Sequence, residues 1–212
     1  MSDYQSLSLH VIAGKEALVK DATKELVAAG NPPLEIINQG LIAGMNVVGA
    51  RFKNGEMFVP EVLMAAKSMA AGIEIVRPLV ADVDMPSIGR VIIGTVKGDL
   101  HDIGKNLVAM MLESSGFYVI NIGIDIAPEK FVSAVKQYNP DIVAMSALLT
   151  TTMLHMKDTI ELIKEEGLHG NVKVIIGGAP ISQDFADEIG ADGFAPDAAS
   201  ATELCKRLLG KM

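Results

Sequence analysis

The sequence predicts an α/β protein in two parts, an N-terminal four-helix bundle and a C-terminal doubly wound parallel sheet of the Rossmann-like kind. From Ser6 to about Ala81, apolar residues recur at three- and four-residue steps, which is typical of amphipathic helices. From Arg90 onward, short β-branched runs alternate with helical stretches, as in a parallel sheet buried on both faces. Hydrophobic residues at 50% and charged residues at 21% suit a globular chain with a sizeable core.

Turn residues divide the first part into about four helices. The segment 30–33, Gly-Asn-Pro-Pro, ends one helix and opens the next, because proline is tolerated in a first helical turn. Residues 53–56, Lys-Asn-Gly-Glu, form the next turn, and Pro60 stands where a further helix begins. Short loops between antiparallel neighbours predict a compact bundle.

The run Asp82 to Ser87 marks the expected domain boundary, because acidic and turn residues there interrupt the helical pattern. We expect a helical domain over residues 1–86 and an α/β domain over residues 87–212. In the second domain, strands are expected at 91–96, 118–121, 142–146, 172–176 and near 193–194, and helices at 103–113, 129–137, 153–165 and in a last stretch ending near 209.

Charge and composition exclude several classes of partner. A net charge of −8 leaves no basic face for nucleic acid or for an anionic membrane. A single cysteine, Cys205, permits no intramolecular disulfide and no cysteine-rich zinc site. The first residues lack a signal-peptide pattern, and no stretch approaches the ~18 apolar residues of a membrane-spanning helix. We therefore expect a cytoplasmic protein.

Unusual residues follow four of the predicted strands at their carboxyl ends, where parallel sheets bind ligands. His101 lies between Asp99 and Asp102, so one carboxylate could hold one ring nitrogen and leave the other for a metal. A second hypothesis is that the two aspartates hold a divalent cation. Neither a dinucleotide fingerprint nor a Walker lysine pattern is present. The four strand-end segments are Lys97–Gly104, Ser146 with Leu148–Thr152, Gly177–Gly178 and Ala195–Ala199.

The pattern Asp-x-His-x-x-Gly, here Asp99 to Gly104, resembles the signature of cobalamin-binding domains. Such domains occur in cobalamin-dependent methionine synthase, in carbon-skeleton mutases and in the small corrinoid proteins of methylotrophic methyl transfer. Ser146-Ala147-Leu148 and Gly177-Gly178 resemble two later elements of that family, and Arg51 to Val62 resembles its helical cap. The resemblance covers nearly the whole chain, which is too short to contain the barrel of a complete mutase.

The resemblance implies a base-off cobalamin whose cobalt is ligated by His101. It places Asp99 on the second ring nitrogen and the hydroxyl of Thr152 behind Asp99. It also places Phe58 and Val62, four residues apart and so on one helical face, over the upper face of the cobalt, although apolar residues at that spacing are more often plain bundle core. The residues implied to contact the cofactor are Phe58, Val62, Gly98, Asp99, Leu100, His101, Asp102, Ile103, Gly104, Ser146, Leu148, Thr150, Thr152, Gly177, Gly178, Asp197 and Ala198.

Within this set, Ser146 is implied to meet the cofactor's nucleotide tail, and Gly177 and Gly178 to make room for it. The implied function is that of a corrinoid methyl carrier, a non-catalytic subunit in which no side chain is a catalyst. It would accept a methyl group on cobalt from a substrate-specific methyltransferase and deliver it to a second one, with tetrahydrofolate or a thiol as acceptor. A reductive activator is the third implied partner. The alternative is a cobalamin-sensing regulatory module, which shares the same cap and sheet.

Overall fold

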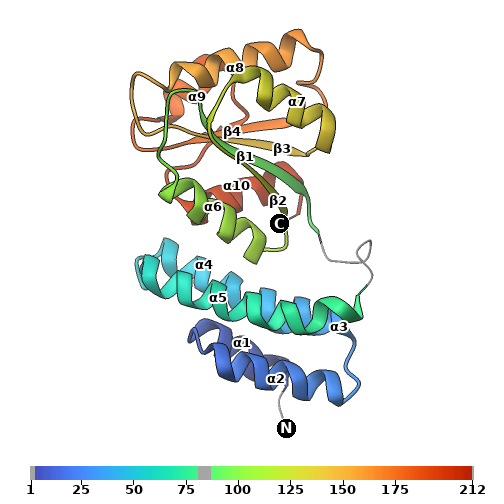
Figure 1. Cartoon of the computed structure of the whole chain (residues 1–212). Coiled ribbons are helices and arrows are strands. Elements are labelled where there is room, and N and C mark those ends of the chain that lie inside the picture. The colour runs from blue at the N-terminus through green and yellow to red at the C-terminus, as the bar shows by residue number, and fades with distance from the viewer. Residues whose placement is uncertain (1–2, 81–86, 212) are drawn as a thin grey trace. The chain divides into compact units, whose positions relative to one another are not determined.

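The computed structural model describes residues 3–80 and 87–211 (Figure 1). The chain separates into two compact units, one of residues 1–87 with 114–116 and one of residues 88–113 with 117–212. Of the expected boundary at 82–87, residues 82–86 lie outside the described part of the chain. Among the described residues, every helix falls short of the length and hydropathy needed to cross a bilayer.

The described residues up to 80 form the predicted helices in the predicted order. They are α1 (Tyr4–Ile12), α2 (Glu16–Ala28), the continuous run of α3 (Pro33–Glu35), η1 (Ile36–Ile42) and α4 (Ala43–Lys53), then α5 (Val59–Val76) and η2 (Arg77–Leu79). Pro33 and Pro60 occupy first helical turns, as predicted. The π-helical η1 was not predicted, because the apolar pattern continues through it without a break.

The core of this helical unit is built from aliphatic side chains of its helices. Leu7, Val11, Val19, Leu26 and Val62 are all buried. Close packing of the helices also depends on glycine: a Cβ on Gly40 would lie 2.5 Å from Leu7 Cδ2. The bundle is therefore held by interdigitating aliphatic side chains.

The α/β unit contains a five-stranded parallel sheet, so the predicted fold class is confirmed. Its strands lie in the order β2-β1-β3-β4-β5. The order reverses at β1, and such a switch point leaves a crevice at the carboxyl ends of β1 and β3. The strands are β1 (Arg90–Val96), β2 (Tyr118–Ile126), β3 (Ile142–Ser146), β4 (Lys173–Gly177) and β5 (Gly193–Phe194).

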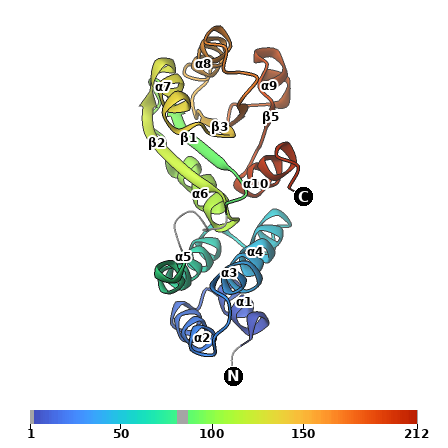
Figure 2. The same ribbon diagram turned by 90° about the vertical axis from the view of Figure 1, so that its right-hand side faces the viewer.

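Helices cover both faces of this sheet (Figures 1 and 2). On one face, Ile92 packs in a buried cluster with Phe131 and Met156; on the other, Ile93 packs with Leu112 and Leu204. This accounts for the continuous apolar strands. The first cluster lies under α7 (Pro128–Tyr138), α8 (Leu154–Glu165) and α9 (Gln183–Ile189), and the second under α6 (Ile103–Ser114) and α10 (Ala198–Leu208).

Two elements differ from the sequence expectation. The seven-residue helix α9 was not predicted; Ser182 caps it by accepting a hydrogen bond from Phe185 N at 3.2 Å. Strand β2 continues five residues beyond the expected Asn121, to Ile126, through shifts in its register with β1. Polar and glycine residues in that extension conceal the strand pattern.

The thiol of Cys205 is expected to be inert in the folded protein. The residue is fully buried in α10, and burial raises the pKa of its thiol to about 12. Titration with a thiol reagent should therefore give no reaction under native conditions at neutral pH and one thiol per chain in denaturant. Rapid reaction of the native protein would contradict this burial.

Candidate functional site

The centre of the candidate site is the loop between β1 and α6, residues 97–102, which we call the histidine loop. Asp99 within it is completely buried. Its Oδ1 lies 2.7 Å from His101 Nδ1 and accepts from His101 N at 3.1 Å. Its Oδ2 accepts hydrogen bonds from Leu148 N at 2.8 Å and from Thr152 Oγ1 at 2.7 Å. Asp99 thus joins the loop after β1 to the loop after β3 at the switch point.

The hydrogen bonds decide the ionisation of Asp99. Burial alone would raise the pKa of this carboxyl, but the donors Leu148, Thr152 and His101 outweigh it and hold the pKa well below its ordinary value. The ionised carboxylate can only accept, so His101 donates to it from Nδ1, and in the neutral ring the lone pair is then on Nε2. The His101 side chain is 51% exposed, so Nε2 is available to a metal.

The second aspartate of the loop has a different role. Asp102 is exposed, and its Oδ2 accepts a hydrogen bond from Asn106 Nδ2 at 3.0 Å. Both oxygens of Asp99 are already committed to protein donors, so the pair does not form a divalent-cation site. In the described part of the chain, no cluster of three or more His, Cys, Asp or Glu side chains is arranged to hold a metal ion.

Apolar side chains are exposed in both loops that Asp99 joins and at the first residue of α6, Ile103. Leu100 and Ile103 are 66% and 84% exposed, and Leu148 and Leu149 are each 42% exposed. Large aliphatic side chains left in water at the mouth of a sheet are typical of a binding surface. A free imidazole nitrogen within apolar surroundings suits a large, flat metal complex.

The glycine pair after β4 is required by the protein's own backbone. A Cβ on Gly178, whose φ is +129°, would overlap the carbonyl oxygen of Ala147, and one on Gly177 would lie 2.8 Å from the oxygen of Ala195. The close approach of neighbouring loops therefore accounts for both glycines without a ligand. Gly104 differs, because a Cβ there would meet nothing within 4 Å.

The remaining predicted residues of the α/β unit are placed as follows. Ser146 is half-buried at the end of β3, and its hydroxyl makes no hydrogen bond among the residues the structure describes. Thr150 is exposed and Ala198 is buried. The Asp197 carboxylate caps α10 by accepting from Ser200 N and Oγ, both at 2.8 Å, so it serves the helix.

The expectation that Phe58 and Val62 lie on one helical face is wrong. Phe58 is 67% exposed, whereas Val62 has no exposed surface. The four-residue rule fails because Phe58 caps α5 in extended conformation, with φ −116° and ψ 167°, and is not itself helical. Val62 belongs to the core of the helical unit.

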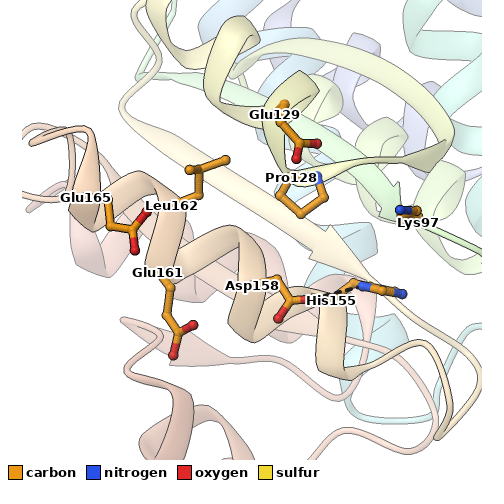
Figure 3. Close-up of a pocket in the computed structure, with 8 residues that line it drawn as sticks. All are labelled: Lys97, Pro128, Glu129, His155, Asp158, Glu161, Leu162 and Glu165. Atoms are coloured by element: carbon orange, nitrogen blue, oxygen red, sulfur yellow. Dashed lines mark hydrogen bonds and ion pairs between the residues drawn. The ribbon is translucent and has the colours of Figure 1, made fainter.

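A cavity of about 350 Å³ lies on the α7 and α8 face of the sheet (Figure 3). Its lining includes Lys97 of the histidine loop but none of the residues implied to contact the cofactor. Within it, His155 Nδ1 lies 2.9 Å from Asp158 Oδ2, the pair joined by the dashed line in Figure 3. Its lining residues are Lys97, Pro128, Glu129, His155, Asp158, Glu161, Leu162 and Glu165.

Sequence reasoning missed four polar residues that support the histidine loop: Lys105, Asn106, Asn121 and Asp125. Their contacts, described below, join α6 and β2 to the loop. No sequence pattern pointed to Asn121 and Asp125, because both are exposed on the edge strand β2 and polar residues are ordinary there.

Comparisons with known proteins identify the family. B12 binding domain families match residues 4–77 and 89–204. A corrinoid protein from Desulfitobacterium hafniense is 42% identical over 214 residues, covering 100% of this chain and 99% of the relative. Dimethylamine corrinoid protein 1 from Methanosarcina acetivorans is 47% identical over 207 residues, covering 97% and 96%.

Solved structures agree with these relatives. A chain of the methanol:cobalamin methyltransferase complex from Methanosarcina barkeri matches with a TM-score of 0.88 and 28% identity, over 99% of this chain and 80% of that one. A cobalamin-binding protein from Desulfitobacterium hafniense matches with a TM-score of 0.83 and 32% identity, over 98% and 99%. The chain belongs to the family of B12-binding corrinoid proteins.

Proposed function

We propose that this protein is a corrinoid methyl carrier of a methyltransferase system. The observation that carries the proposal is the hydrogen-bonded set of Thr152, Asp99 and His101 at the switch point of the sheet. Relatives named for dimethylamine and trimethylamine, and a structural match within a methanol:cobalamin methyltransferase complex, support the methyl-transfer setting.

The residues present fit a corrinoid bound base-off, with His101 Nε2 as the lower cobalt ligand. The exposed side chains of Leu100, Ile103 and Leu148 would contact the macrocycle, and the free hydroxyl of Ser146 would hydrogen-bond to the displaced nucleotide tail. Gly104 would allow α6 to begin close to that tail, because its Cβ position is open. Two further residues of the predicted set, Gly98 and Thr150, would lie at the edge of the same surface.

Once bound, the corrinoid supplies a cobalt that takes up a methyl group from one partner enzyme and yields it to another. Asp99 would hold the Nδ1 side of the His101 ring and so leave Nε2 to ligate the cobalt. The ionised Asp99 would accept the Nδ1 hydrogen bond of His101 whether or not the cobalt is ligated. Thr152 and the Leu148 amide hold Asp99 fixed throughout.

We further propose that the two parts of the chain have different roles. Residues 87–212 would form the cobalamin-binding domain and residues 1–86 a helical cap, to which Phe58 contributes an exposed aromatic side chain. The partners would be a substrate-specific methyltransferase, a second methyltransferase with a tetrahydrofolate or thiol acceptor, and a reductive activator, all in the cytoplasm. The partner enzyme would select the methyl donor.

A methyl-transfer assay tests this proposal. The protein is loaded with hydroxocobalamin, reduced, and mixed with a dimethylamine-, trimethylamine- or methanol-specific methyltransferase and its substrate. We expect the visible spectrum to change from that of the reduced to that of the methylated cofactor with one enzyme and substrate pair. Binding of cobalamin without methylation by any pair would overturn the carrier function and favour a cobalamin sensor.

A further inference from the structure

The carboxyl end of strand β2 holds the histidine loop from the side that precedes His101. Asp125 Oδ1 accepts a hydrogen bond from Gly98 N at 2.7 Å, and Asp125 N donates to the Asp99 carbonyl oxygen at 3.1 Å. One residue thus contacts two consecutive residues of the loop. Neither contact involves the Asp99 carboxylate, so this attachment is independent of the set described above.

The backbone of β2 is distorted where it makes these contacts. Asp125 has φ +54°, a left-handed conformation that few non-glycine residues adopt, and Gly123 has φ +100°. The register with β1 advances from Gly94–Gly123 to Val96–Ile126, which places an extra residue in β2 as in a β-bulge. Bulges turn a side chain away from its regular direction. Here the bulge brings Asp125 to the histidine loop.

A second attachment from β2 reaches the side that follows His101. Lys105, in the first turn of α6, is buried, and its Nζ donates to Asn121 Oδ1 at 2.8 Å and to Asn106 Oδ1 at 2.6 Å. Asn106 Nδ2 in turn donates to Asp102 Oδ2 at 3.0 Å. The edge strand therefore holds the residues on both sides of His101 through Asn121 and Asp125.

We propose that Asp125 is a positioning residue that, supported by Asn121, fixes the histidine loop in the metal-ligating conformation before the cofactor arrives. The proposal rests on the proposed function for what His101 ligates, but its prediction for the cofactor-free protein does not. If the loop is already ordered, it loses less conformational entropy when the cofactor binds, and the binding free energy is more favourable. The strained φ of Asp125 is maintained because its hydrogen bonds to Gly98 and Asp99 compensate for it.

Three substitutions distinguish the contribution of the Asp125 carboxylate from that of its left-handed backbone conformation. Asp125→Gly keeps the left-handed conformation and removes the acceptor, Asp125→Ala removes both, and Asp125→Asn retains an acceptor oxygen and tolerance of positive φ. Asn139→Ala is the matched control, because Asn139 has φ +45° at the end of α7 and no contact with the histidine loop is recorded for it in the described chain.

The first measurement is hydrogen exchange in the cofactor-free protein. We expect the Gly98 amide to exchange roughly tenfold faster in Asp125→Gly and Asp125→Ala than in wild type, as for loss of one charge-assisted hydrogen bond. Asp125→Asn should remain near wild type, and Asn139→Ala should alter exchange only around α7. Unchanged Gly98 exchange in Asp125→Gly would overturn the proposal, whatever the cofactor does.

The second measurement is the electron paramagnetic resonance spectrum of bound cob(II)alamin, in which an axial nitrogen ligand splits the lines. We expect Asp125→Gly to reduce the histidine-ligated fraction while circular dichroism stays unchanged, and Asp125→Asn to restore it. Full ligation in Asp125→Gly, or an equal loss in Asn139→Ala, would contradict positioning by Asp125. Failure of wild type itself to show nitrogen splitting would count against the proposed function and leave the exchange result standing.

Discussion

Replacement of Gly178 by alanine is expected to destabilise the protein by about 4 kcal/mol or more and to abolish cofactor binding. The added Cβ would overlap the carbonyl oxygen of Ala147, a backbone atom that no side-chain rotation can move. Gly178 also has φ +129°, which an alanine adopts only at a cost in strain. Because Ala147 directly precedes Leu148, whose amide donates to Asp99, relief of the overlap would displace a donor of the site.

Urea unfolding of the cofactor-free protein measures this effect. Gly170→Ala is the control, since a Cβ at Gly170 would meet nothing within 4 Å. Gly104→Ala provides a second comparison: its Cβ position is also open, so stability should be kept, whereas cobalamin affinity should fall if the nucleotide tail lies against it. A Gly178→Ala protein as stable as Gly170→Ala would show that the strand ends are not packed as described.

Asp99→Ala should cost about 3 kcal/mol of folding free energy, because it removes a buried acceptor and leaves its donors unsatisfied. Those donors are the amide of Leu148, the hydroxyl of Thr152 and the ring of His101. With His101 released, the nitrogen that we propose as the cobalt ligand would no longer be oriented. Asp102→Ala is the control in the same loop, and we expect it to change stability by less than about 0.5 kcal/mol because Asp102 is exposed.

The pH dependence of this effect follows from the ionisation of Asp99. Its pKa in the folded protein is lower than the ordinary value of 3.8, so the carboxylate stabilises the fold above that value and the contribution is lost as the pH falls below it. The difference in unfolding free energy between wild type and Asp99→Asn should therefore be largest near neutrality and shrink below about pH 4. A difference that grows on acidification would contradict the ionised, hydrogen-bonded state.

The parts of the fold that could be predicted from the sequence are those set by local pattern. Strand β3 lies at the predicted residues 142–146, since its run is short, apolar and bounded by turn residues. The pattern predicts that strand β2 ends at Asn121, five residues too early. The strand continues through polar residues whose contacts lie with other parts of the chain, such as that of Asn121 with Lys105. The π-helical turn at η1 could not be predicted either, since it leaves the apolar pattern intact.

Some residues of the candidate site could likewise be predicted from the sequence and others could not. Asp99 and His101 could be identified because a motif between a strand and a helix carries them, and Thr152 because the family resemblance implied it. The structure brings all three together. Asp125 could not be, since its contact with Gly98 depends on a bulge and a positive φ. The prediction for Phe58 and Val62 failed because helical spacing applies only within a helix, and α5 begins at Val59.

The most direct test of the central claim is electron paramagnetic resonance of the cob(II)alamin-loaded protein grown with ¹⁵N-labelled histidine. If His101 ligates the cobalt, the axial splitting changes from the triplet of ¹⁴N to the doublet of ¹⁵N, and it is lost in His101→Ala. His155→Ala, which removes the half-buried histidine paired with Asp158, should leave the splitting unchanged. A triplet that persists with labelled histidine, as from the cofactor's own base, would contradict ligation by His101.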